Sequence, residues 1–154
     1  MSRAQSHRIP ESGKELKPSD LVWFVPCFAR AIYHLARARL KLRRVSPIAI
    51  KARNRALLEA FADNGIDAGS LEILLDRLSF TIPRTAGRMP WRADCLVQAF
   101  AAQDILASKS IGSAVVIGVK NDDCDGFAAH AWLECGSRTI TGGEIQGYAE
   151  LLHS

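Results

Sequence analysis

The chain has 154 residues, the size of a single domain built around one hydrophobic core. Hydrophobic residues make up 48% and charged residues 23% of the sequence, which excludes a disordered or fibrous protein. The formal net charge is +4, and the basic residues concentrate before Pro90. A basic surface can attract nucleic acid, anionic lipid or acidic peptides, but it is more often a solvated face, so no nucleic acid partner is expected.

The first residues and the cysteines indicate a cytoplasmic protein. Residues 1–17 are polar, lack the apolar core of a secretory signal and are expected to form a mobile arm. The four cysteines contain no CxxC pair, as is typical of a reducing compartment. The longest apolar stretch, residues 21–29, is too short to span a bilayer, which takes about 20 residues. No membrane insertion is therefore expected.

Residues 18–82 are expected to form a helical N-terminal part. Apolar residues recur at helical spacing after Asp20, and basic residues occupy the other faces up to Ser46–Pro47. A second helix should end at Asn64–Gly65, where glycine favours a left-handed cap. A third should open at Ser70 and end before Pro83. The predicted helices cover about residues 19–45, 48–62 and 70–82.

Residues 83–154 have a different pattern, which predicts a helix followed by antiparallel strands. Residues 95–106 are apolar on all sides, as in a buried helix. Residues 114–119 are rich in β-branched side chains and predict a central strand. A turn over residues 121–126 should lead into a hairpin. Its strands should cover residues 127–134 and 139–141.

Cys95 stands where a helix start would activate a thiol. Asp94 is a good N-cap residue, which puts Cys95 in the first turn of the buried helix. Free backbone N–H groups and the helix dipole favour a thiolate there, although an ionised Asp94 partly opposes it. The same N–H groups can bind an oxyanion after the sulfur attacks a carbonyl.

His130 is the histidine best placed to serve as the base for such a thiol. His7 lies in the arm, His34 in the basic helix and His153 beside the C-terminus. Strand alternation puts His130, Trp132 and Glu134 on one face. The plainer alternative is that Cys95 and His130 are both ordinary core residues, since free cysteine is often buried. Of the other cysteines, Cys27 is expected in the core, and Cys124 and Cys135 in a loop or turn.

These residues also resemble a known family. The segments PWRADCLVQAFAAQDIL, AVVIGV and GFAAHAWLE, followed by GG after the next strand, are similar to the lasso peptide biosynthesis B2 proteins. These are stand-alone relatives of the C-terminal part of the microcin-processing protein, in the transglutaminase-like superfamily. The resemblance covers about residues 75 to 152, with consistent order and spacing.

The resemblance implies an α+β fold with a transglutaminase- or papain-like core, in which the cysteine helix lies against an antiparallel sheet. Cys95 matches the family's nucleophile and His130 its histidine. The implied activity is a cysteine peptidase that removes the leader from a lasso peptide precursor through a thioester, without a metal or cofactor. The implied partners are the precursor peptide, a separate leader-recognition protein of the B1 type, and an ATP-dependent macrolactam-forming cyclase.

The third catalytic residue is open, because residues 138–143 contain no acid where the superfamily often has an aspartate to orient the histidine. The aspartate would fall near Gly142. A two-residue hairpin turn leaves Thr141 diagonal to His130, whereas a loop longer by one residue puts Glu144 opposite it. We favour Glu144 over Thr141 and Glu134.

The sequence also offers two tryptophans as candidates for substrate contact, and it leaves two other functions open. Trp91 and Trp132 are candidates for contact with substrate, although a tryptophan packed on the sheet is the commoner case. The same core supports another acyltransferase or amidase reaction, since a fold does not determine the acceptor. The missing acid also leaves open a non-catalytic module that binds a peptide.

Overall fold

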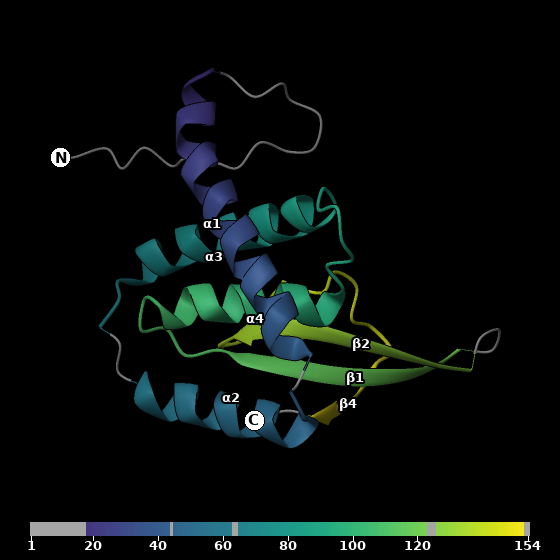
Figure 1. The fold of residues 1–154 in the computed structure, drawn as a ribbon. Helices are drawn as coiled ribbons and strands as arrows, with labels where there is room; N and C mark the ends of the chain where they lie inside the picture. The colour runs from purple at the N-terminus through teal and green to yellow at the C-terminus, as the bar shows by residue number, and fades with distance from the viewer. Residues whose placement is uncertain (1–17, 44, 63–64, 123–125, 153–154) are drawn as a thin grey trace.

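The computed structural model describes residues 18–43, 45–62, 65–122 and 126–152. It has four helices and a four-stranded antiparallel sheet, so the α+β prediction is confirmed (Figure 1). In the described part of the chain no helix combines the length and apolar character needed to cross a membrane. The elements are α1 (Pro18–Leu42), α2 (Pro47–Ala60), α3 (Ala68–Ala86), α4 (Cys95–Ala107), β1 (Ala114–Asp122), β2 (Gly126–Cys135), β3 (Arg138–Thr141) and β4 (Ala149–Leu152).

Two of the helix starts follow from local chemistry. The Ser46 side chain accepts a hydrogen bond from the backbone N–H of Ala49, and Pro47 occupies the first turn of α2, where no N–H is needed. The Asp67 carboxylate caps α3 by accepting from the N–H of Ser70. The predicted arm, residues 1–17, and Asn64 lie outside the described residues.

The predicted helix break at Pro83 is wrong, because α3 continues through this residue to Ala86. Pro83 is exposed, so its ring faces water. The buried stripe of α3 meanwhile continues past it, through Ile82 to Ala86. Tertiary packing of that stripe outweighs the one backbone hydrogen bond that proline cannot donate. The expected boundary between residues 82 and 83 therefore falls inside a helix.

The strand order is β3-β2-β1-β4, with all neighbours antiparallel. Cys135 pairs with Arg138 across a two-residue turn, which makes β2 and β3 a tight hairpin, as predicted. The edge strand β4 is additional to the predicted strands, and it pairs with β1 only around Ile117 to Val119. Beside it, the Asn54 side chain of α2 donates to the C=O of Val115 and accepts from its N–H. This amide therefore makes the two hydrogen bonds that a neighbouring strand would make at Val115.

The core lies between α4 and the sheet, and α1 and α3 cover the outer side of α4 (Figure 1). Phe100 and Leu106 of α4 pack in one cluster with Val115 of β1 and Leu133 of β2. Cys135 also belongs to this cluster, and its thiol contacts the carbonyl oxygen of Gly112 at 3.4 Å. The expectation of a turn position for Cys135 is therefore wrong; Cys124 lies outside the described residues.

Candidate active site

Cys95 is the first residue of α4, as the sequence predicted. Asp94 occupies the N-cap position with an extended backbone, and its carbonyl accepts the N–H of Gln98. The Cys95 side chain is half-buried and has no disulfide partner. Its sulfur is therefore held at the positive end of a helix dipole and remains partly accessible.

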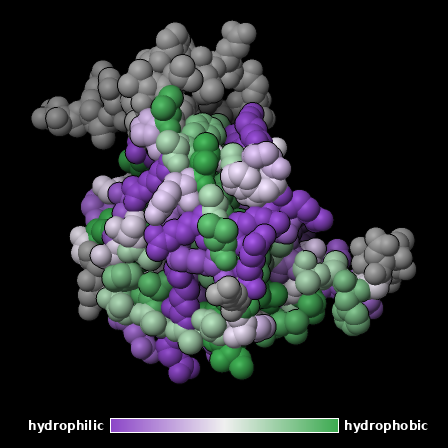
Figure 2. Space-filling model, in the orientation of Figure 1, coloured by the Kyte–Doolittle hydropathy of each residue, from purple (hydrophilic) through white to green (hydrophobic). Residues whose placement is uncertain are grey.

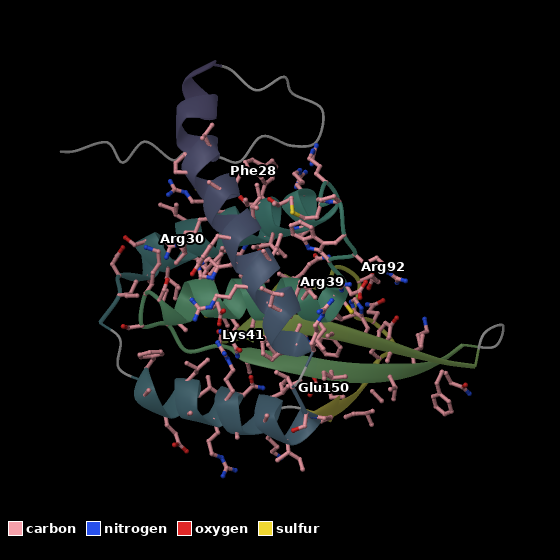
Figure 3. The ribbon with its side chains drawn as sticks, viewed as in Figure 1. Phe28, Arg30, Arg39, Lys41, Arg92 and Glu150 are labelled. Atoms are coloured by element: carbon pink, nitrogen blue, oxygen red, sulfur yellow. The ribbon has the colours of Figure 1, made fainter. Side chains whose placement is uncertain are left out.

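The Asp94 carboxylate does not cap the helix by a side-chain hydrogen bond. It lies 3.2 Å from Nε of Arg92 instead, and both side chains are exposed. Arg92 extends away from the segment that leads into α4 (Figure 3). Among the described residues nothing accepts a hydrogen bond from the first-turn N–H groups of Cys95 and Leu96. These donors are available to an anion or a polarised carbonyl oxygen.

His130 is half-buried on β2, and its ring is held from three sides. Its Nε2 lies 2.6 Å from the carbonyl oxygen of Gly142. A carbonyl oxygen carries no proton, so Nε2 must be the donor in this contact. The rings of Tyr148 and Trp132 lie 5.3 Å and 6.2 Å from the imidazole, measured between centroids. The remaining nitrogen, Nδ1, has no hydrogen-bond partner among the described residues.

Cys95 and His130 do not interact directly in the described structure. No hydrogen bond links the thiol to the imidazole among the described side chains. The body of α4 packs on the sheet face that carries Val115 and Leu133. Because side chains alternate along a strand, His130 and Trp132 lie on the opposite face, as their contacts with the 142–148 segment indicate.

None of the three candidates for the orienting group bonds the imidazole within the described residues. A bulge between Leu133 and Glu134 shifts the pairing toward a register that would place Glu144 opposite His130. However, β3 ends at Thr141, and the chain then turns through two glycines with positive φ, so Glu144 is exposed to solvent. The Glu134 carboxylate accepts a hydrogen bond from Nε1 of Trp132 at 2.7 Å.

Two of the candidate residues have buried polar atoms without a hydrogen-bond partner among the described residues. Thr141 is 2% exposed, and its hydroxyl has no partner among the described residues. Trp91, in the connection before α4, is half-buried and its Nε1 is likewise unpartnered within that part of the chain. Trp132, the other tryptophan considered for substrate contact, is only 1% exposed and so offers a substrate almost no surface.

Sequence reasoning missed Gly142 and Tyr148 as neighbours of His130. Gly142 contributes only a backbone carbonyl, which every residue type has. Its signal is conformational: φ is 110°, and an added Cβ would lie 2.5 Å from Cβ of Trp132. Tyr148 comes from the connection to β4, which the sequence pattern did not reveal. No group of three or more potential metal ligands occurs among the described residues.

Comparison with known proteins assigns the family. Residues 32–153 match the family model of the transglutaminase-like superfamily, which covers most of the chain. No curated protein and no solved structure matches significantly. The matched range includes α4 with Cys95, the strand with His130 and most of the helical part. The chain therefore belongs to the transglutaminase-like superfamily.

Proposed function

We propose that the protein is a cysteine peptidase that removes the leader from a ribosomally synthesised lasso peptide precursor, with Cys95 as nucleophile and His130 as base. Membership of a superfamily that includes cysteine peptidases and acyltransferases supports the reaction class. The observation that carries the assignment is the partly accessible Cys95 thiol beside unpaired N–H groups at the start of α4. The choice of a lasso precursor rests on the sequence resemblance around both residues.

In the proposed reaction, Nδ1 of His130 takes the thiol proton and the thiolate attacks the scissile carbonyl. The first-turn N–H groups of α4 hold the oxyanion of the tetrahedral intermediate. The C–N bond then breaks, and His130 returns its proton to the leaving amine. Water, deprotonated by His130, hydrolyses the thioester and releases the Cys95 thiol. This chemistry requires Sγ of Cys95 and Nδ1 of His130 to lie within about 3–4 Å of each other.

We further propose that the carbonyl of Gly142, rather than Glu144, orients the imidazole. Its 2.6 Å contact with Nε2 keeps the proton on that nitrogen and leaves Nδ1 as the free base. Thr141 and Glu134 contribute packing and the bond to Trp132. Glu144→Gln should then leave cleavage within about twofold of wild type, because Glu144 does not carry the orienting contact.

Mass spectrometry of the precursor peptide tests the function. The peptide is incubated with the full chain and the small leader-recognition protein, with wild type compared against Cys95→Ala and His130→Ala. A single cut that both variants abolish is the expected result. Cys27→Ala is the matched control, because Cys27 is also a half-buried free thiol but lies on α1. Cleavage that survives in Cys95→Ala contradicts the proposal.

A non-catalytic peptide-binding module is the second candidate. It is favoured by two absences among the described residues: no hydrogen bond joins Cys95 to His130, and no acid bonds the imidazole. It predicts that wild type and both variants bind the precursor equally and leave it intact. An acyltransferase on the same core would be detected by adding a primary amine, which would appear attached to the acyl product.

A further inference from the structure

Helix α1 has a second apolar face that nothing in the described structure covers. Its buried side carries Ala31, Leu35 and Ala38, which pack toward α3 and α4. On the opposite side, four large apolar side chains recur at intervals of seven or eight residues and so form one stripe along the helix. These residues are Val25 (59% exposed), Ile32 (42%), Tyr33 (57%) and Leu40 (68%).

Arginines run along both edges of this α1 stripe. At 3.6 residues per turn, Arg30 and Arg37 lie on one side of the stripe and Arg39 on the other. Figure 3 shows Arg30 and Arg39 extending from opposite sides of α1. Figure 2 shows the same arrangement as a broken apolar line between hydrophilic surfaces. The stripe is therefore apolar along its centre and cationic along its edges.

In the described part of the chain these edge arginines form no ion pair. Arg30 donates to the Ser108 hydroxyl at 2.6 Å and Arg37 to the Tyr33 hydroxyl at 3.2 Å, and both acceptors are neutral. Within the described residues none of the three arginines pairs with a carboxylate. The sequence explains this, because residues 21–58 include nine Lys and Arg and no Asp or Glu. These guanidinium groups form no ion pair among the described residues, so they can bind carboxylates of another molecule.

We propose that the α1 stripe is the docking surface for an acidic amphipathic helix of a partner protein. From Val25 to Leu40 the stripe is about 22 Å long, which is four helical turns, and its spacing matches the anchors of a helix laid against a helix. Carboxylates on the partner would form two-pronged hydrogen bonds with the edge arginines. This inference does not depend on the chemistry of Cys95.

A protein partner fits the stripe better than nucleic acid or a membrane. Nucleic acid binding rests on phosphate contacts and gains nothing from exposed valine, isoleucine and leucine. A membrane-bound helix buries a broad apolar face to a depth of about 5–10 Å. Here α1 is packed into the domain on its other side, and among its described side chains, from residue 25 on, four large apolar ones are exposed along the stripe.

Fluorescence anisotropy with three designed 18-residue helices tests this surface. The peptides share one leucine face, and their polar positions are Glu, Lys or Ser. The full-length protein should bind the Glu helix at least about tenfold more tightly than the other two, and added salt should weaken binding. Leu40→Ser and Arg39→Glu should each reduce the affinity about tenfold. Ile73→Ser on α3 and Arg88→Glu are matched exposed controls that should leave it unchanged.

Circular dichroism melts verify that each variant is folded, since Arg39 is half-buried whereas the other three substituted side chains are exposed. The proposal is overturned if the Glu helix binds no better than the Ser helix, or if the control substitutions weaken binding as much as the stripe substitutions. Two further measurements bear on other occupants of the stripe. Wild-type binding to vesicles with one quarter phosphatidylglycerol, lost in Leu40→Ser, would assign it to a membrane. Dimerisation lost in the same variant would assign it to a second copy.

Discussion

The two faces of the sheet are packed in different ways. On the face toward α4, branched and aromatic side chains such as Phe100, Val115 and Leu133 interlock in the main core. On the face that carries His130, one tryptophan, Trp132, fills the space, and it fits only because the adjacent residues are glycines. A Cβ added to Gly118 would lie 2.7 Å from the Trp132 ring, and one added to Gly142 would lie 2.5 Å from its Cβ.

This difference in packing determines how each face of the sheet responds to amino-acid substitution. A core of interlocking side chains can absorb a change of shape by repacking, at a cost that grows with the cavity left behind. A tryptophan against glycine backbone leaves no side chain that can move aside. The histidine face is therefore the more rigid of the two, and rigidity suits a face whose backbone carbonyl holds an imidazole.

Gly142→Ala should be the most damaging single substitution on the histidine face. The new methyl would collide with Cβ and Cα of Trp132, and the residue would also keep a φ of 110°. Backbone cannot yield as a side chain does, so we expect a loss of about 4 kcal/mol or more in a urea unfolding experiment. Gly143→Ala is the matched control: its φ is 63° and its added Cβ meets nothing within 4 Å, so about 1–2 kcal/mol is expected. Equal losses would refute the steric account.

The same contact makes Gly142 intolerant of any side chain. Any side chain at Gly142 would strike Trp132, so Gly142→Asp should fail to fold rather than restore an acid to the site.

Leu133→Ala tests the packing on the sheet face toward α4. Leu133 is fully buried in the cluster with α4, and its removal leaves a cavity that neighbouring side chains fill in part. We expect a loss of about 3 kcal/mol, from chemical unfolding followed by tryptophan fluorescence. Ile73→Ala is the control, because Ile73 is 46% exposed on α3 and should cost about 0.5 kcal/mol or less. If Leu133→Ala cost as little as its control, α4 would not be seated on this face.

Asp104 forms an acid-sensitive contact among the helices on the α4 side of the sheet. This α4 residue bridges Lys41 of α1 and Arg53 of α2. Burial raises the pKa of its carboxyl, but the hydrogen bond from Lys41 and the charge of Arg53 outweigh burial, and the pKa lies below its usual 3.8. Because the Asp104 pKa is lower in the folded state than in the unfolded state, the ionised carboxylate stabilises the fold above the unfolded-state value. This stability is lost as the pH falls through the folded-state pKa.

Asp104→Asn should therefore cost about 1–2 kcal/mol at pH 7, a moderate value because Lys41 and Arg53 are partly exposed. The variant should also lose less stability than wild type as the pH falls below the usual carboxyl pKa of 3.8, measured by thermal melts over a series of acidic pH values. A variant whose acid profile overlays that of wild type would show that the bridge does not contribute.

Helix α4 and the β2–β3 hairpin could be predicted from the sequence, since both are local. Asp94 before an apolar run marks the start of α4, and Gly136 after a strand marks the tight turn, where its φ is 59°. Cys95 at a helix start required no knowledge of the rest of the fold. These features depend on residues within a few positions of one another.

Other features were unpredictable because their causes are not local. The helix continues through Pro83 since the buried stripe around it outweighs one missing hydrogen bond. Strand β4 has four residues and is held by pairing with β1, which lies about 30 residues earlier. The hydrogen bond of the His130 imidazole goes to the backbone oxygen of Gly142, and no sequence motif encodes it. The relative position of Cys95 and His130 likewise depends on tertiary packing between α4 and the sheet.

The smallest expected effect concerns His34, which is buried on α1 near Asp104. Burial lowers the pKa of its imidazole from the usual 6.5, the Asp104 charge opposes this, and Arg30, Arg37 and Lys41 lower the pKa further. The unfolded chain then binds the proton more tightly, so stability should decline as pH falls below about 6.5. His34→Gln should flatten the pH dependence of the unfolding free energy between pH 7 and pH 5, with a change under about 1 kcal/mol. Asp104→Asn should instead steepen the decline in that window, because it removes the charge that opposes the lowering of the His34 pKa. A flat wild-type profile would mean that the helix side tolerates a charged His34, and acid sensitivity there would rest on Asp104 alone.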